Sequence, residues 1–434
     1  MFFTLFLITL IFHIFFCAIK DKTLLTPFGV YGIIWFLLLT LTQTSIINYD
    51  TFSNTTVCII YLAYFSFLLS SLFYNQKKFN IVLNNTTKDL NMKKLKNIGI
   101  CFLGLYLIMA IIYAALIINF FGGISEIFAA PYTTREKFLE ADIIPLYISY
   151  PMSSGYVVAG IFSFLLFFNK NKLRDVILYL LPLLIVICTD LLSFSRMNIL
   201  FYIIIYFSSF CLKYISLNKS RKVKYLKILV VGAIMALIVL IVPKLFRNSG
   251  DYSTDIYWEY SNIKSINKFT GSFLHLYAYA TGPMAAFNKF VLDLPNELLW
   301  GRASFAPIYN VLGRIFSIKI SNFSILYSSV SVPFKTNIYT YLKEAYLDFG
   351  ICGVIVFPLV WGALMSCCSN IKVKNNYIKI VVFQYIYLYI IFGIFYTPYS
   401  QGGPALGMFI YMLIIILFGN KIKKTVRNNK EIKQ

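Results

Sequence analysis

The chain has 434 residues, of which 59% are apolar, 18% aromatic and only 13% charged, whereas an average soluble domain is roughly 45–50% apolar and about 25% charged. This composition excludes a soluble globular enzyme, a disordered chain, a collagen-like chain and a disulfide-stapled secreted module. The net charge of +22 is compatible with a nucleic-acid binder or with a membrane protein that has basic loops, and the positions of the charges decide between them.

Apolar runs near or above the roughly 20 residues needed to cross a bilayer recur along the whole chain. They predict an all-α, polytopic membrane protein with about eleven transmembrane helices, forming a single integral membrane domain over 1–434. The expected spans are at about 1–19, 24–47, 55–74, 97–121, 144–168, 176–192, 198–217, 228–245, 346–368, 378–397 and 402–420.

The basic residues are concentrated in six segments between these runs, and threading the spans puts all six on one side of the membrane. The six segments are 20–22, 75–97, 169–175, 213–227, 369–379 and the tail after 420. They hold 26 Lys and Arg against four acidic residues, while the other side holds 13 of each sign. By the positive-inside rule the basic side is cytoplasmic. We therefore expect the N-terminus outside, the C-terminus in the cytoplasm, and no nucleic-acid partner.

Two further features concern the ends of the spans. The first run lacks a basic region before it and a small-residue cleavage site after it, so we expect an uncleaved anchor rather than a signal peptide. All eight cysteines fall within spans or at their cytoplasmic ends. We therefore expect no disulfide, and without a Cys/His cluster we expect no metal and no cofactor.

Two outward-facing segments are much longer than the other connections. The first periplasmic loop is 122–143 and the large periplasmic loop is about 246–345. Long connections of this kind usually carry function. Within the large loop the semi-apolar stretch 272–292 is interrupted by Gly282-Pro283, and a full crossing here would break the charge segregation. We therefore expect a helical loop with a re-entrant or interfacial pair of half-helices.

Chemistry on the outer side must use a substrate that arrives already activated, because nucleotide donors are cytoplasmic. Lipid-linked diphosphate sugars meet that need, and guanidinium groups bind diphosphates in a bidentate manner. The outer arginines are Arg135, Arg196, Arg247, Arg302 and Arg314. The alternative for Arg196 is a snorkelling side chain paired with Asp190 or lipid headgroups. The alternative for Arg135 and Arg247 is an interfacial charge.

Three outer residues are candidates for the general base. His275 lies in the re-entrant stretch, and a neutral imidazole is suited to deprotonate a sugar hydroxyl. Glu344 and Asp348 are spaced i, i+4, so a helix places both on one face. The alternatives are an interfacial histidine, a Glu344 paired with Lys343 or Arg302, and an Asp348 that favours a helix N-terminus.

Several of these stretches together resemble a known family. They are Asn337-Ile338-Tyr339-Thr340-Tyr341, Glu344-Ala345-Tyr346-Leu347-Asp348-Phe349-Gly350, Gly353, Pro358, Gly362, Ser195-Arg196, Thr281-Gly282-Pro283 with Phe287, Gly301-Arg302 and Pro27. Over nearly the full length the chain is similar to Wzy-type polymerases of oligosaccharide repeat units, such as O-antigen polymerases. The Asp-Phe-Gly sequence that opens a late span after a long outer loop is the most recognisable piece.

The resemblance implies a metal-independent glycosyltransferase of the bacterial inner membrane that polymerises undecaprenyl-diphosphate-linked glycans of a lipopolysaccharide or similar surface polysaccharide. It would put Arg196, Arg302 and Arg314 against the diphosphates, with His275 or an outer carboxylate as base and aromatic residues against the sugars. A flippase and a chain-length regulator would be its partners. The alternatives are an O-antigen ligase, which shares the architecture, and a lipid-linked oligosaccharide flippase.

Overall fold

The computed structural model describes residues 2–21, 23–129, 134–135, 137–138, 143–195, 197–217, 261–262, 268–293, 298–316, 329–370, 377–397 and 400–422. The described chain is helical apart from a short antiparallel hairpin of β1 (Val330–Ser331) and β2 (Lys335–Thr336) and one bridge between Ile47 and Ser261. The structure therefore confirms the predicted all-α class.

The helices follow the apolar runs of the sequence. They are α1 (Phe2–Asp21), α2 (Pro27–Gln43), α3 (Asn54–Ser71), α4 (Gln76–Asp89), α5 (Met92–Phe121), α6 (Ile124–Ala129), α8 (Leu146–Met152), α9 (Ser154–Phe168), α10 (Leu173–Leu192), α11 (Met197–Ile215), α14 (Lys268–Leu292), α15 (Ala306–Ile315), α17 (Leu342–Asn370), α18 (Tyr377–Phe392) and α19 (Gly402–Ile422). Seven helical stretches of the described chain are long and apolar enough to cross a membrane, and three shorter apolar stretches are Pro27–Gln43 in α2, Tyr377–Phe392 in α18 and Gly402–Leu417 in α19. The predicted span 228–245 lies outside the described residues.

Polar residues just before the apolar runs fix where several helices begin. Thr26 Oγ1 accepts a hydrogen bond from the Gly29 N–H at 3.2 Å, directly before Pro27 at the first position of α2. Ser53 caps α3 in the same way through the Thr56 N–H at 3.0 Å. Such caps satisfy N–H groups that have no partner within the helix, and proline fits the first turn because it lacks an N–H.

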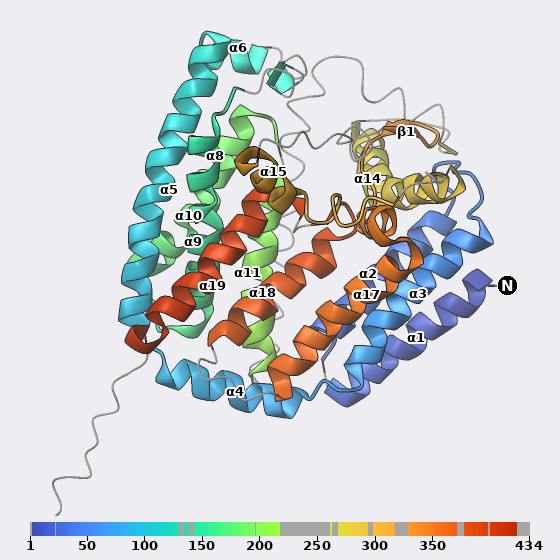
Figure 1. Cartoon of the computed structure of the whole chain (residues 1–434), viewed down its shortest axis with the longest axis horizontal. Helices are drawn as coiled ribbons and strands as arrows, with labels where there is room; N and C mark the ends of the chain where they lie inside the picture. Colours follow the sequence, from blue (N-terminus) through green and yellow to red (C-terminus); the bar gives the residue numbers. More distant parts are fainter. Residues whose placement is uncertain are drawn as a thin grey trace, which may run out of the picture.

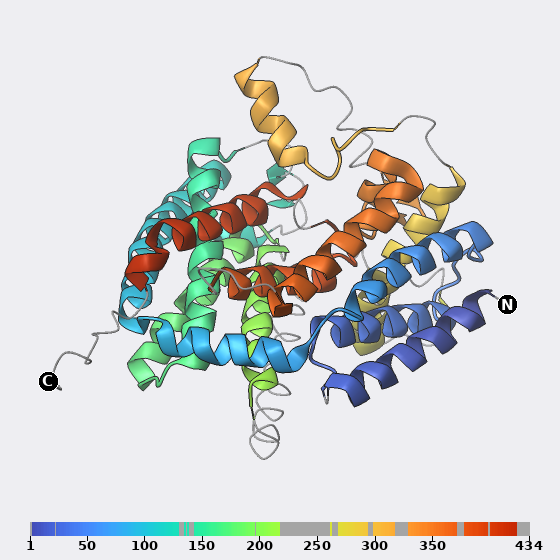
Figure 2. The same ribbon diagram turned by 60° about the horizontal axis from the view of Figure 1, so that its bottom comes forward.

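The helices form two groups that α18 connects (Figures 1 and 2). In one group α17 packs along α3, with α1 and α2 beside them; in the other, α9 is surrounded by α5, α10, α11 and α19. Gly362 allows α17 to approach α3 closely, because an added Cβ would lie 2.7 Å from the Ser70 Cβ. Ser366 Oγ donates to the Ser70 carbonyl at 2.5 Å. Small residues of this kind are typical of helix pairs in membranes.

The outer surface of the bundle is apolar, as a bilayer requires. Large side chains such as Phe12, Phe15 and Ile19 of α1 are exposed, although patches of this kind are rare on soluble monomers. Lipid contact explains them, since these side chains find in acyl chains the apolar surroundings that a core would otherwise supply. The described helices thus belong to a membrane-embedded protein.

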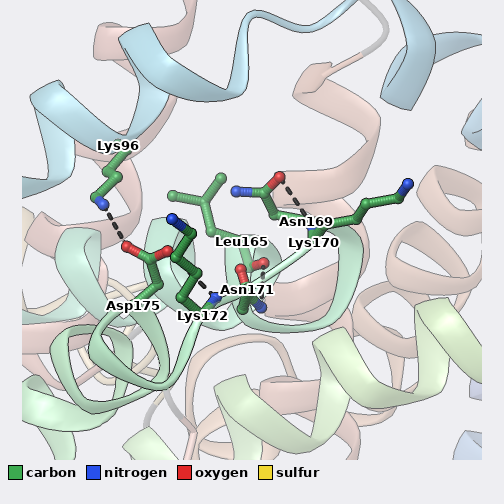
Figure 3. Close-up of polar contacts among 7 residues, drawn as sticks. All are labelled: Lys96, Leu165, Asn169, Lys170, Asn171, Lys172 and Asp175. Carbon is green, nitrogen blue, oxygen red and sulfur yellow. Dashed lines mark hydrogen bonds and ion pairs between the residues drawn. The ribbon is translucent and has the colours of Figure 1, made fainter.

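One end of the bundle carries α4 and the turn 169–172, and we call it the basic end (bottom of Figure 1). The helix α4 buries Phe79 and Leu83 and exposes Lys77 and Lys78. The Lys96 Nζ atom lies 2.5 Å from Asp175 Oδ1 and links the start of α5 to that of α10 (Figure 3). We call the opposite end, with α6, α15 and the hairpin, the loop end.

The stretch 272–292 differs from the prediction of two half-helices. It forms the single helix α14, which continues through Gly282-Pro283. External contacts hold the helix at this point: Tyr49 and Thr281 hydroxyls lie 2.7 Å apart, and Tyr277 Oη donates to the Leu41 carbonyl at 2.7 Å. These contacts act against the cost of a proline inside a helix, which is about 3 kcal/mol.

Candidate functional site at the loop end

A tight turn at 298–305 is attached to the start of α17 by four hydrogen bonds. Two link backbone to backbone, from the Leu299 N–H to the Leu347 carbonyl at 2.9 Å and from the Trp300 N–H to the Asp348 carbonyl at 3.1 Å. The other two end on the Asp348 carboxylate. Its Oδ1 accepts the Ala303 N–H at 2.9 Å and its Oδ2 accepts the Ser304 N–H at 2.6 Å.

The Asp348 side chain is completely buried, at 0% exposure. A carboxylate is stable in such a place only when its oxygens are hydrogen-bonded, and here each oxygen accepts an amide N–H. Both oxygens therefore serve the turn. The geometry gives Asp348 a positioning role. Its role as a general base stays a prediction.

The two residues after Asp348 serve the same turn. Gly350 interrupts α17 with φ 59° and ψ −144°, a region that is essentially restricted to glycine. The break separates a short first segment of α17 from the long apolar one. Phe349 lies against Gly301, where an added Cβ would be 3.5 Å from the Phe349 Cζ, and Gly301 itself has φ 91°. The Asp-Phe-Gly sequence thus forms the surface against which the 298–305 turn packs.

Arg302 occupies the turn that Asp348 holds. Its backbone N–H donates to the Leu299 carbonyl at 3.1 Å, and its side chain is exposed. It takes part in neither of the two salt bridges found within the described part of the chain. The structure therefore presents this guanidinium on a fixed backbone and leaves it available to an anion.

Glu344 lies one turn before Asp348 and is also buried, at 6% exposure. Its Oε2 accepts a hydrogen bond from Thr397 Oγ1 at 3.2 Å. The neighbouring Lys343 is 1% exposed, and its Nζ lies 3.6 Å from the centre of the Tyr339 ring. The ammonium over an aromatic face and the adjacent carboxylate compensate each other in a place where an isolated charge would be costly.

Arg135 of the first long loop reaches the hairpin between α10 and α11. Its Nη1 donates to the Ser193 carbonyl at 3.2 Å. Burial lowers the pKa of the Arg135 guanidinium below its ordinary value, and the nearby Tyr113, Asp190 and Tyr279 act in the opposite direction. An arginine keeps its charge under such conditions. Arg135 therefore brings a partly buried cation to the loop end.

Asp190, predicted as a partner of Arg196, organises the same hairpin. Its Oδ1 accepts from Asn198 Nδ2 at 2.8 Å and its Oδ2 from the Ile199 N–H at 3.2 Å. The hairpin tip is covered, because Phe194 is buried and packs edge-on against Phe128 of α6. Sequence reasoning did not identify α6 as the cover of this tip, since a six-residue helix gives little periodic signal.

Four of the predicted site residues have side chains outside the described part of the structure. Arg196 and Arg247 lie outside the described residues. His275 and Arg314 lie in α14 and α15, but their side chains are outside the described part. Their roles stay predictions. Among the described residues, no cluster of three His, Cys, Asp or Glu side chains could hold a metal ion.

A small pocket of about 100 Å³ opens between α14 and the β-hairpin. One wall consists of Ala278, Tyr279 and Pro283, and the other of residues 334–338. Sequence reasoning identified Gly282-Pro283 and the stretch from Asn337 separately. Only the fold brings them together around one space.

The fold and this end of the bundle define an all-α, membrane-embedded protein with a structured polar site at the loop end. Comparison with known proteins adds no relative: no family model, no curated protein and no solved structure matches the chain. Function therefore has to be argued from the residues themselves.

Proposed function

We propose that this protein polymerises undecaprenyl-diphosphate-linked oligosaccharide repeat units at the periplasmic face of the bacterial inner membrane. The observation that carries the proposal is the hydrogen-bonded seat of Arg302, in which Asp348 fixes the turn and leaves the guanidinium exposed. A preorganised cation beside a membrane surface is suited to hold the diphosphate of a lipid carrier.

The proposal includes eleven spans, an outer N-terminus and a cytoplasmic C-terminus. Two observations support this orientation. The basic end contains α4 with the exposed Lys77 and Lys78, as the positive-inside rule expects of a cytoplasmic side. The loop end contains the Arg302 turn and Arg135. Both long loops then belong to the periplasm, where lipid-linked glycans are available.

The proposed reaction is the transfer of a growing glycan from its carrier to a new repeat unit. A hydroxyl of the acceptor sugar attacks the anomeric carbon of the donor glycan, and the bond from that carbon to the diphosphate oxygen breaks. The hydroxyl proton passes to the base, and undecaprenyl diphosphate leaves with the electron pair of the broken bond. Arg302, with Arg196 and Arg314, would stabilise the charge that develops on this leaving group.

His275 is the favoured base in this proposal. Asp348 accepts two amide N–H groups, and Glu344 is buried and accepts a hydrogen bond from Thr397, so both carboxylates already make structural contacts. Arg135 and Arg247 would contribute to binding of the second carrier diphosphate.

The fixed 298–305 turn would favour diphosphate binding by Arg302, because little backbone conformational freedom is lost on binding.

The test is deletion of the gene in its host followed by electrophoresis of the surface glycan. A polymerase predicts lipopolysaccharide that carries single repeat units, because flipping and ligation continue without it. Loss of all O-antigen would instead indicate a ligase or a flippase and would overturn the proposal. Restoration of long chains by the wild-type gene, but not by Arg302→Ala, would tie the activity to the turn.

A further inference from the structure

We propose that the pocket between α14 and the β-hairpin is a subsite for one sugar unit of the lipid-linked glycan. This inference rests on the proposed function and deepens it, because it assigns the glycan to a place separate from the Arg302 turn. The pocket volume of about 100 Å³ is below the roughly 300–1,000 Å³ of sites that enclose drug-sized ligands. It therefore suits a single small unit rather than an oligosaccharide.

The two walls differ in chemistry in the way that a sugar ring requires. Ala278, Tyr279 and Pro283 offer an apolar and aromatic surface on the α14 side. The hairpin side is lined by Lys335, Thr336 and Asn337, three successive residues with polar side chains. A pyranose has C–H groups on its faces and hydroxyls around its edge, so it can contact both walls at once.

The polar groups of the hairpin are accessible. Lys335 and Asn337 are exposed, and Lys335 belongs to neither salt bridge of the described chain. Thr336 Oγ1 accepts the Ile338 N–H at 3.2 Å, and its own proton can still be donated. Asn337 uses its backbone carbonyl to accept a hydrogen bond from Tyr396 Oη at 3.2 Å. That bond ties the Asn337 backbone to Tyr396, and the residue stays exposed.

The pocket is also rigid, which lowers the entropic cost of binding. Phe334 is buried at its base, in a cluster with Ile47, Leu274 and Tyr277. Gly282 permits this contact, since an added Cβ would lie 3.2 Å from the Phe334 Cζ. The bend of the hairpin is closed by a hydrogen bond from the Val332 N–H to the Phe334 carbonyl at 2.9 Å.

Cysteine protection tests the subsite directly. Asn337→Cys is labelled with a membrane-impermeant maleimide in membrane vesicles whose periplasmic face is outward. The probes are the lipid-linked repeat unit extracted from the deletion strain and undecaprenyl diphosphate without sugar. Asp293→Cys is the matched control, because this exposed residue follows the end of α14 at about 15 Å from Pro283 along the helix. Lys335→Cys is a second reporter should Asn337→Cys not accumulate.

The expected result is that the glycan-bearing lipid slows labelling of Asn337→Cys and Lys335→Cys roughly tenfold at ten times its dissociation constant, since only about one site in eleven then stays free. Undecaprenyl diphosphate alone should leave both rates unchanged, and Asp293→Cys should react equally under all conditions. Equal rates with and without the glycan lipid would overturn the subsite, as would equal protection by the carrier alone. A strain that polymerises normally yet shows no protection would refute the subsite and leave the polymerase proposal intact.

Discussion

Ser304 donates its backbone N–H to Oδ2 of Asp348 at 2.6 Å, across 44 residues of sequence. Together with the bond from the Ala303 N–H at 2.9 Å, it makes a buried carboxylate the anchor of a surface turn. The two bonds share one rigid acceptor, so the turn cannot shift without leaving a buried charge unsatisfied. Among the five arginines predicted for the site, Arg302 is the only one whose exposed side chain the structure describes, and this relationship connects it to the start of α17.

Asp348→Asn should destabilise the protein and weaken polymerisation together. One carboxylate oxygen is replaced by an NH₂ group that faces a backbone N–H, and an unsatisfied buried donor costs about 1–3 kcal/mol. The measurements are the thermal unfolding midpoint in detergent and the glycan chain length in the complemented deletion strain. Asp293→Asn, at an exposed position, should change neither. Complete inactivity of Asp348→Asn with an unchanged midpoint would instead support a role as general base.

Gly350→Ala should be destabilising although space for a methyl group exists. The nearest atom to an added Cβ, Leu298 Cδ2, is 3.9 Å away, so the penalty comes from the backbone. At φ 59° and ψ −144° an L residue is strained by about 1–3 kcal/mol.

Gly104→Ala is the matched control for this effect, because Gly104 lies inside α5 with no atom within 4 Å of an added Cβ. That substitution should stabilise by about 0.5–1 kcal/mol, as alanine does inside a helix. Both variants can be compared by thermal unfolding in the same detergent. Equal midpoints for Gly350→Ala and wild type would show that the kink at Gly350 is absent from the protein.

Arg302→Ala should abolish long chains without loss of protein from the membrane, because the side chain is exposed and makes no stabilising ion pair in the described chain. Arg302→Lys should retain partial activity, since lysine keeps the charge but cannot form two parallel hydrogen bonds to a diphosphate. Chain length is read by electrophoresis and protein level by immunoblotting. Lys289→Ala removes a half-buried cation of α14 that lies 3.5 Å from Asp293 and should leave chain length unchanged. Wild-type chains in Arg302→Ala would remove the diphosphate role.

His275→Ala and Glu344→Gln distinguish the two remaining bases. Glutamine retains an oxygen that can accept from Thr397 Oγ1, now 3.2 Å from Glu344 Oε2, but it removes the negative charge beside the buried Lys343, so the level of folded protein is measured alongside activity. We expect His275→Ala to lower the rate of polymerisation by about 10²–10⁴-fold, the usual contribution of a general base, and Glu344→Gln to remain active. The reverse pattern would transfer the role to Glu344. The assay is the incorporation of labelled repeat units by purified protein.

The loop containing α14 illustrates what sequence patterns alone leave open. Gly282-Pro283 predicts an interruption, because proline removes a helical hydrogen bond, yet α14 continues through it. The contact between Tyr49 and Thr281, 2.7 Å apart and 232 residues distant in sequence, helps to hold the helix. Gly282 instead serves the close approach of Phe334. The pair Gly282-Pro283 therefore does mark a structurally important position, but it marks a close contact with Phe334 and not a break in the helix.

The candidate site shows the same division. The Asp-Phe-Gly sequence resembles a family signature, and the i, i+4 spacing of Glu344 and Asp348 predicts that both candidate bases share a helical face. Spacing places two carboxylates on one helical face but says nothing of what covers that face. In the fold Asp348 is covered by the 298–305 turn and Glu344 by Thr397.

The class of the protein was determined by the sequence itself. A bilayer requires about 20 consecutive apolar residues per helix and the positive-inside rule sorts the loops, so both signals are written in local composition. The partners of Asp348 and the pocket beside Asn337 were decided by the tertiary structure. They depend on segments tens of residues apart in the sequence, and only the packing of α14, the 298–305 turn and the hairpin against the helices at the loop end brings those segments together.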